Sequence, residues 1–272
     1  STHRGTLFPY TTLFRSTWKV TDSRAEWQSD IQNIEARLDF SHAISDKLNL
    51  QYGATTTYHM FNPALITRAG YSDFRMNRSY ALEHTIYFGS EQHLSKAITV
   101  NYGARLTAFR NMGKTLQYHY DNNYDVSGAT EYGSGKIYHT YIRPEFRAGM
   151  VYKLDDWSSV KANFTHNTQF IQIANNSDSG SPLDLWFPAS PNIKPQEANQ
   201  YSVGYFRNFK ENTIETSVEF YYKGMKNVID FKDNAQILFN EKLDGDIRTG
   251  KGKSYGMEIM VKKNTGRLTG FV

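Results

Sequence analysis

Residues 34–58 read IEARLDFSHAISDKLNLQYGATTTY, and this stretch decides the class of fold. In 34–40 the even positions are apolar and the odd positions between them are charged. A polar turn at 45–47 comes next, and the alternation then resumes through 48–58. Side chains that switch between apolar and polar at every step have the period of a β-strand with two different faces. The stretch therefore predicts two antiparallel strands joined by a tight turn.

The same arrangement recurs along the rest of the chain. Further alternating segments are 80–88 with 98–106, 142–154 with 160–170, 201–209 with 214–222, and a last pair that begins at 255 and stops at 272. Turns of about three to six residues join the members of each pair, whereas connectors of roughly 18 to 30 residues separate the pairs. The long connectors are 61–79, 111–136, 173–197 and 226–253. Short and long connections thus alternate strictly.

Alternating connections of this kind are typical of barrels that span an outer membrane, with short periplasmic turns and long extracellular loops. Each strand holds about 10 to 14 residues and, when tilted, covers roughly 25 to 30 Å, the thickness of a hydrocarbon core. We predict an all-β fold, an antiparallel transmembrane β-barrel fragment of about ten long strands. We expect the periplasmic rim to hold the tight turns at Ser45, Ser95, Asp155, Glu211 and Thr265.

The aromatic content agrees with this fold. Aromatic residues make up 15% of the 272 residues, and many lie near strand ends, as Tyr58, Tyr80 and Tyr222 do. Amphipathic rings at those positions mark the headgroup level of a membrane, although the strand preference of tyrosine would produce a similar pattern. The mean hydropathy of −0.62 fits because only alternate residues of a barrel wall need to be apolar.

The sequence lacks the features of an enzyme or a metal site. It has no Cys, and its eight His show no paired metal-binding spacing. Residues 245–252 (GDIRTGKG) approach a phosphate-binding loop, but Gly252 stands where Ser or Thr is needed, so we interpret them as a flexible loop. Asp121, Asn123 and Asp125 have the spacing of a calcium loop without its Gly and final Glu. We predict no catalytic residue, no metal and no cofactor.

Charge also excludes one class of partner. The net charge is +4, but the Lys and Arg residues are dispersed and interleaved with Asp and Glu. Nucleic-acid binding needs a basic patch or stripe instead. We therefore expect no nucleic-acid partner.

Both ends interrupt the alternating pattern. Residues 5–16 (GTLFPYTTLFRS) bear no relation to the strand pattern that begins after them, and they look like translated sequencing adapter. We therefore assign 1–16 to an artefact outside the fold. Residues 268–272 open a strand that is cut off in mid-span. We expect 17–272 to be a partial barrel truncated at both ends.

One stretch carries a family resemblance. Residues 184–205 (DLWFPASPNIKPQEANQYSVGY) resemble the mid-to-late barrel of TonB-dependent outer-membrane receptors, in the branch that imports glycans or chelated iron. The family's recurring phrase corresponds here to Pro191, Asn192, Ile193, Lys194, Pro195, Gln196, Tyr201 and Gly204. Pro195 holds the preceding residue extended, and a Gly within a strand permits close approach of neighbouring atoms. The resemblance covers about residues 18–272 and is strongest in the last third.

The resemblance implies a barrel of about 22 strands in the outer membrane of a Gram-negative cell, filled by an N-terminal plug. It implies active uptake of an oligosaccharide or chelated iron, with energy from the inner-membrane TonB complex acting through the plug. We find neither the plug nor the TonB box in this chain. Outer-membrane lipid is an implied partner, and a lipoprotein partner is possible within the family.

Loop aromatics are the ligand contacts we predict, because flat rings stack on sugar or catechol faces. They are Tyr71, Phe74, Tyr124, Trp186 and Phe187. The alternative is a purely structural role, in which these rings only pack the loops onto one another. Two alternatives to an active transporter also stay open at this point: a passive porin-type channel, and a soluble carbohydrate-binding β-sandwich.

Overall fold

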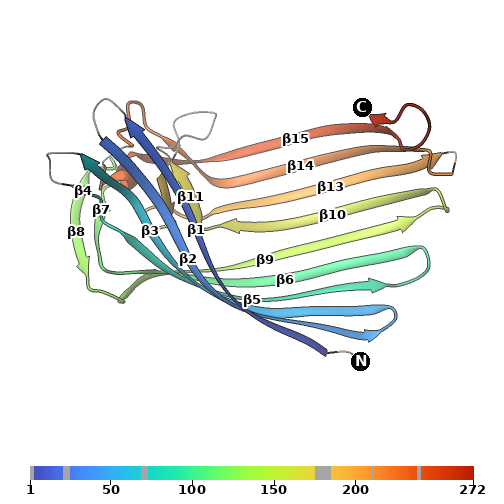
Figure 1. The fold of residues 1–272 in the computed structure, drawn as a ribbon, viewed down its shortest axis with the longest axis horizontal. Coiled ribbons are helices and arrows are strands. Elements are labelled where there is room, and N and C mark those ends of the chain that lie inside the picture. The colour runs from blue at the N-terminus through green and yellow to red at the C-terminus, as the bar shows by residue number, and fades with distance from the viewer. Residues whose placement is uncertain (1–2, 21–24, 69–72, 175–184, 210, 238–239) are drawn as a thin grey trace.

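The computed structural model describes residues 3–20, 25–68, 73–174, 185–209, 211–237 and 240–272. Within them, a single antiparallel sheet of twelve strands curves into an open half-barrel (Figure 1). Its strands run in the order β1-β2-β3-β5-β6-β9-β10-β13-β14-β15-β16, with β4 beside β3. Two small two-stranded sheets, β7-β8 and β11-β12, lie in the long connectors. The predicted all-β barrel fragment is confirmed.

The elements are β1 (His3–Val20), β2 (Ala25–Ser45), β3 (Leu48–Arg68), β4 (Phe74–Arg75), β5 (Ser79–His93), β6 (Ile98–Met112), β7 (Thr115–Tyr120), β8 (Val126–Tyr132), β9 (Ile137–Lys153), β10 (Ser158–Gln169), β11 (Ile171–Ala174), β12 (Leu185–Pro188), β13 (Gln196–Phe209), β14 (Ile214–Phe231), the 3-10 helix η1 (Leu243–Asp246), β15 (Ile247–Lys263) and β16 (Gly270–Phe271). No helix in the described part of the chain is long and apolar enough to cross a membrane.

The two faces of the sheet differ as the alternation predicts. Apolar side chains on one face are exposed to the surroundings, with Ile86 and Ile259 at 60% and Ile142 at 57%. The polar side chains between them point to the concave side. The register keeps each set together, since Leu38 lies opposite Ala54 and Phe88 opposite Ala104. An apolar outer wall around a polar interior results from this pairing.

The short and the long connections between strands lie at opposite ends of the half-barrel. The tight turns gather at one end of the half-barrel and the long connectors at the other (Figure 1). Side chains close the tight turns: Ser95 Oγ accepts the N–H of Ala97 at 3.2 Å, and Asp155 Oδ1 accepts the N–H of Trp157 at 2.8 Å. Small polar residues of this kind hydrogen-bond to the backbone a few positions on and so favour turns.

Strand length was predicted too short. The ten long strands of the main sheet have 12 to 21 residues, and several continue beyond the span that a membrane requires. Residues 247–252, interpreted as a flexible loop, belong to β15 and pair with β14. The strands are longer than predicted because backbone pairing continues past the apolar band, where side chains no longer need to alternate between apolar and polar.

The buried core lies where the strands of the wall meet the long connectors. One cluster contains Ile31, Phe61, Ala81, Phe109, Tyr141, Phe170 and Ala189. In it the rings of Phe109 and Phe170 stack with centroids 5.0 Å apart. Burying a large apolar side chain contributes about 1.5 to 3 kcal/mol, so this cluster stabilises the connectors against the wall.

Strand β1 covers most of the segment that we assigned to an artefact. Its backbone pairs with β2 from His3 opposite His42 to Val20 opposite Ala25. This pairing shows that the residues form a strand, which is a separate question from whether they are native. The assignment of 1–16 to an artefact stays a prediction.

Candidate functional site

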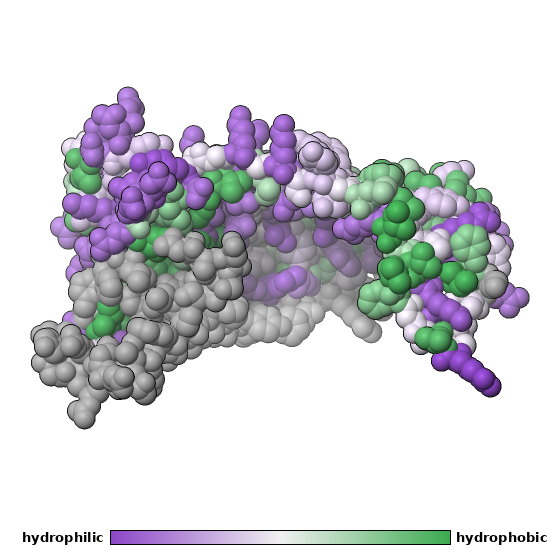
Figure 2. All heavy atoms as spheres, turned by 90° about the horizontal axis from the view of Figure 1, so that it is seen from above, coloured by the Kyte–Doolittle hydropathy of each residue, from purple (hydrophilic) through white to green (hydrophobic). Residues whose placement is uncertain are grey.

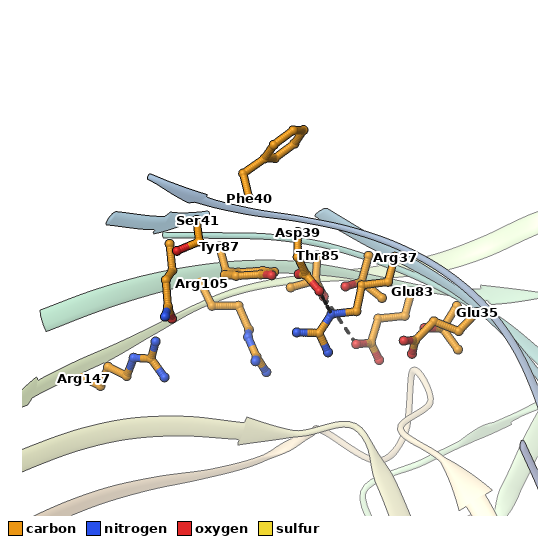
Figure 3. Close-up of a pocket in the computed structure, with 13 residues that line it drawn as sticks. Glu35, Arg37, Asp39, Phe40, Ser41, Glu83, Thr85, Tyr87, Arg105 and Arg147 are labelled. Carbon is orange, nitrogen blue, oxygen red and sulfur yellow. Dashed lines mark hydrogen bonds and ion pairs between the residues drawn. The ribbon is translucent and has the colours of Figure 1, made fainter. Parts of the chain in front are cut away.

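The concave wall contains a polar hollow of about 560 Å³. Strands β2, β3, β5, β6 and β9 supply its lining, which includes Arg37, Glu83, Thr85, Tyr87, Arg105 and Arg147. Figure 3 shows these side chains pointing to the same side of the sheet, whereas Phe40 points to the opposite side. In Figure 2, hydrophilic residues line the shaded hollow between the two ends of the molecule. The wall thus offers many polar groups to whatever fills the interior.

Ion pairs hold several of the charged groups of the wall. Arg37 Nε lies 2.7 Å from Asp39 Oδ2, and Arg105 Nη1 lies 3.5 Å from Glu145 Oε2. Arg143 Nε donates to Glu197 Oε1 at 3.0 Å. Pairs at this exposure contribute little to stability, typically up to about 1 kcal/mol. Their main effect is to hold each charge in a set place.

Arg147 is supported differently. Gly89 and Gly103 lie directly opposite each other on β5 and β6, and Gly103 is the partner of Arg147 on β9. A Cβ at Gly89 would lie 2.7 Å from Arg147 Nη2, and one at Gly103 would lie 2.9 Å from its Nε. The guanidinium therefore occupies space that any other residue at these positions would fill. It forms no ion pair with a described residue, so its charge is available to a ligand or a partner segment.

This arginine was not predicted from the sequence. Glycine inside a strand was interpreted as a point of close approach only at Gly204. The same signal was present at Gly89 and Gly103, which interrupt otherwise regular strands. Which side chain uses the space depends on register across three strands, so it needed the structure.

A second polar cluster lies at the long-connector end, around Asp244 in η1. Ser190 Oγ donates to Asp244 Oδ2 at 2.7 Å, and Asn192 Nδ2 donates to the same oxygen at 2.9 Å. Burial raises the pKa of the Asp244 carboxyl, while hydrogen bonds from Asn192, Ser190 and Gln117 lower it and offset part of the rise. Because Gln117 lies on β7, this carboxyl joins three of the long connectors.

Neighbouring groups add to this joint, which we call the Asp244 cluster: Gln117, Ser190, Asn192 and Asp244. Tyr141 donates its hydroxyl to the Ser190 carbonyl at 2.8 Å, and Tyr120 donates to the Lys242 carbonyl at 3.1 Å. Burial is the largest cause that raises the pKa of Tyr120, to about 12. The phenol therefore stays a hydrogen-bond donor over the whole physiological pH range.

The family-pattern residues lead from this cluster into the wall. Ser190 Oγ accepts the N–H groups of Asn192 and Ile193, both at 3.2 Å, and closes a turn around exposed Pro191. Exposed Lys194 then precedes buried Pro195, whose carbonyl accepts a 2.9 Å hydrogen bond from Asn227 Nδ2. The first part of the family pattern, residues 191–195, therefore forms a hydrogen-bonded turn that leads into β13.

Two further residues of the pattern lie within β13. Tyr201 projects from the outer face at 52% exposure, and its ring lies 5.0 Å from that of Phe164. Gly204 faces the interior, where a Cβ would lie 2.8 Å from Glu219 Cγ. These contacts belong to the wall itself, so the structure gives the pattern a local packing context.

The predicted aromatic contacts do not gather in one described pocket. Tyr71 lies outside the described residues, and so does the side chain of Phe74 in β4. Tyr124 is 45% exposed at a turn, with Arg248 Cζ 3.6 Å from its ring centroid. Trp186 and Phe187, in β12, pack against different apolar clusters. Ligand contact by these five residues stays a prediction.

The described residues contain no group of three or more His, Asp or Glu placed to hold a metal ion. In the stretch with calcium-loop spacing, Asp121 Oδ1 accepts the N–H groups of Asn123 and Asp125, at 2.8 and 2.9 Å. This carboxylate closes a local turn.

Comparison with known proteins points in one direction. Residues 1–270 match the family model described as TonB dependent receptor-like, beta-barrel. No curated protein matches the chain.

Several solved structures share the fold. The FrpB iron transporter from Neisseria meningitidis is 13% identical, with a TM-score of 0.58 over 90% of this chain and 35% of that one. The copper transporter OprC is 12% identical, with a TM-score of 0.61 over 89% of this chain and 37% of that one. The ferripyoverdine receptor of the outer membrane of Pseudomonas aeruginosa is 12% identical, with a TM-score of 0.58 over 97% and 36%. The chain thus spans between 35% and 37% of the length of these structures.

Proposed function

This chain belongs to the TonB-dependent receptor-like β-barrel family, and from that membership we propose that it is part of an outer-membrane active transporter. The transporter takes up a scarce ligand, an oligosaccharide or chelated iron, with energy from the inner-membrane TonB complex. The family is one of transport receptors and not of enzymes.

Family membership is the observation that carries the proposal, and the division of the wall into two faces supports its membrane orientation. An apolar outer face suits lipid, and a polar inner face with a hollow of about 560 Å³ suits a water-filled or plug-filled interior. In this orientation the tight turns face the periplasm and the long connectors face outward. The soluble β-sandwich alternative is wrong, because the sheet belongs to a barrel family.

The long connectors supply the outer ligand-binding surface. Exposed Tyr124 offers one flat face to a sugar or a catechol, and the half-buried rings of β12 lie in the next long connector. Iron and copper transporters occur among the structures with the same fold, which is compatible with chelated iron as the ligand. The proposed partners are outer-membrane lipid, the TonB complex through the plug region, and a lipoprotein. Nucleic acid is not among them.

Uptake by the full-length protein tests this function. In Gram-negative cells that express it, import of ferric chelates or oligosaccharides should require functional TonB and stop in a TonB-deficient strain. Purified protein in liposomes should not admit small sugars in a swelling assay. Small-solute passage that is independent of TonB would identify a passive porin-type channel and overturn the proposal.

A further inference from the structure

One part of the third long connector lies across the wall. β11 and β12 form a hairpin in which Ile171 pairs with Pro188 and Ala174 pairs with Leu185. β12 lies against β2, β3 and β5. The next strand in the chain is nevertheless β13, which β6, β9 and β10 separate from β5 in the sheet. The connector therefore reaches back over several strands. We call its residues 170–174 and 185–193 the shelf.

The wall residues beneath the shelf face the interior. Phe61 and Ala81 are at most 1% exposed and belong to one buried cluster with Ala189 of the shelf. Phe61 shares a face of β3 with Thr57, and Ala81 shares a face of β5 with Glu83. Thr57 and Glu83 line the polar hollow. Because Ala81 lies only about 7 Å along the strand from Glu83, on the long-connector side, the shelf covers the inner face directly beside the hollow.

A bulge widens the apolar area on which the shelf rests. The pairing of β2 with β3 shifts register between Gln28 and Asp30. In a regular strand, Phe61 and Ala64 would face opposite sides, because they are three positions apart. The bulge brings Ala64 to the shelf side as well, where it is fully buried in a cluster with Leu185. An apolar area on an otherwise polar inner face is favourable only while it stays covered.

Hydrogen bonds fasten the shelf from two sides. From the wall, Asn111 Nδ2 donates to the Ala189 carbonyl and the Tyr141 hydroxyl donates to the Ser190 carbonyl, both at 2.8 Å and both buried. From the connectors, Asp244 Oδ2 accepts the Ser190 hydroxyl at 2.7 Å. Lifting the shelf would expose the apolar area beneath it and leave buried donors of the wall without acceptors. These are the contacts of a core element and not those of a movable loop.

We propose that the shelf stays fixed on the inner wall throughout transport and permanently narrows the long-connector mouth beside the hollow. A ligand then enters past the shelf without lifting it, so the shelf limits the size of what reaches the hollow. A lid that closes over a bound ligand would behave in the opposite way. The role in transport rests on the proposed function, whereas the fixed position of the shelf does not.

Cysteine accessibility tests the proposal, because the chain contains no Cys of its own. Full-length protein without any other cysteine receives a single one through Leu185→Cys or Ile193→Cys, at positions that are 1% exposed and where Cys is the smaller residue. Ile173→Cys is the matched control, because Ile173 is 39% exposed in the same shelf. In intact cells, a membrane-impermeant maleimide should label the two buried cysteines at least a hundredfold more slowly than the control.

Loosening the shelf should remove this protection. Asn111→Ala deletes the donor to the Ala189 carbonyl and should speed labelling of both buried cysteines at least tenfold. Asn101→Ala, on the same face of β6 near the tight turns, should leave the rates unchanged. If Asn111→Ala does not fold, Tyr141→Phe takes its place, since it removes only one hydroxyl. Buried cysteines labelled as fast as the exposed control, or equal rates in the Asn111→Ala and Asn101→Ala backgrounds, would overturn the proposal.

Labelling in TonB-proficient and TonB-deficient strains, with ferric chelates or oligosaccharides supplied, separates this inference from the proposed function. Slow labelling of the buried cysteines in both strains supports the fixed shelf. Labelling that accelerates only during TonB-dependent uptake would overturn the fixed shelf and leave the transporter standing. Slow labelling in cells that show no TonB-dependent uptake would count against the transporter and leave the shelf standing.

Discussion

Ser190 Oγ donates a 2.7 Å hydrogen bond to Asp244 Oδ2 and thereby joins two long connectors across 54 residues of sequence. Asn192 reinforces the bond from the same turn. The long-connector end of the molecule is thus cross-linked by a half-buried carboxyl, and the connectors form one structural unit.

Replacing Asp244 by Ala should loosen that unit. A hydrogen-bond donor left without its acceptor costs up to about 1 to 3 kcal/mol when it is buried, and buried Ser190 and exposed Asn192 would both lose Asp244 as their acceptor. We expect faster hydrogen exchange and protease cleavage within 240–246, with the strands of the wall unchanged. Asp233→Ala is a suitable control, because this residue is exposed in the same connector. Equal effects of the two substitutions would contradict the importance of the Asp244 cluster.

The joint should also depend on pH. Burial raises the pKa of Asp244 above the ordinary 3.8, so the folded connectors hold its proton more tightly than the open ones. Its contribution is fully present below pH 3.8 and is lost as the pH rises through the raised value. After correction for intrinsic exchange, amide protection of 240–246 should fall over that window in the wild type. Asp244→Asn, which cannot titrate, should remove the change.

Replacing Gly89 or Gly103, the two glycines beneath Arg147, by Ala should lower stability to different extents. A Cβ at Gly103 would lie 2.8 Å from the carbonyl oxygen of Phe88, which cannot move freely, so Gly103→Ala should destabilise the barrel by about 1 to 3 kcal/mol. At Gly89 the nearest atom is the flexible end of Arg147, and a smaller loss is expected.

Gly250→Ala provides the control for both substitutions, because a Cβ there meets nothing within 4 Å. Urea unfolding followed by heat-modifiable gel migration measures the three stabilities. A loss at Gly250 as large as that at Gly103 would show that general strand propensity, and not the close approach, sets the effect.

Tyr124 gives the most direct test of ligand contact. Its ring is 45% exposed and carries Arg248 on one face, so the substitution Tyr124→Ala should cost no more than about 1 kcal/mol of stability. If the ring stacks on the ligand, affinity should fall about tenfold, in line with about 1 to 1.5 kcal/mol for an aromatic contact. Tyr124→Phe should bind normally. Tyr152→Ala, at the tight-turn end of β9, is the control. Calorimetry with the transported ligand would decide, and unchanged affinity in Tyr124→Ala would remove this residue from the site.

The periodic part of the fold was predictable because lipid contact imposes a simple rule. Ile34, Ile86 and Ile142 had to alternate with polar residues, since one face of each strand meets an apolar surrounding and the other does not. The rule ends where the apolar band ends. For that reason the strand at 247–252 was missed, although its backbone pairs as regularly as any other.

The inner sites could not be predicted in the same way. Arg147 lies over Gly89 and Gly103 because three strands meet in one register, and no local signal in the sequence links these positions. No feature of the sequence distinguished Asp244 from the other polar residues of its connector, where an aspartate is ordinarily exposed. It is held by hydrogen bonds from Asn192 and Ser190, in one turn 52 and 54 residues earlier in the chain.

The strand period, the tight turns and the separation of short from long connectors are all encoded locally, because each depends on residues that are neighbours in the chain. Which polar groups meet became clear only in the folded sheet: Arg147 with its glycines, Asp244 with Ser190, and Asn111 with the carbonyl of Ala189. The physical reason is that cross-strand contacts depend on register and curvature, which the whole sheet sets collectively and no single segment encodes.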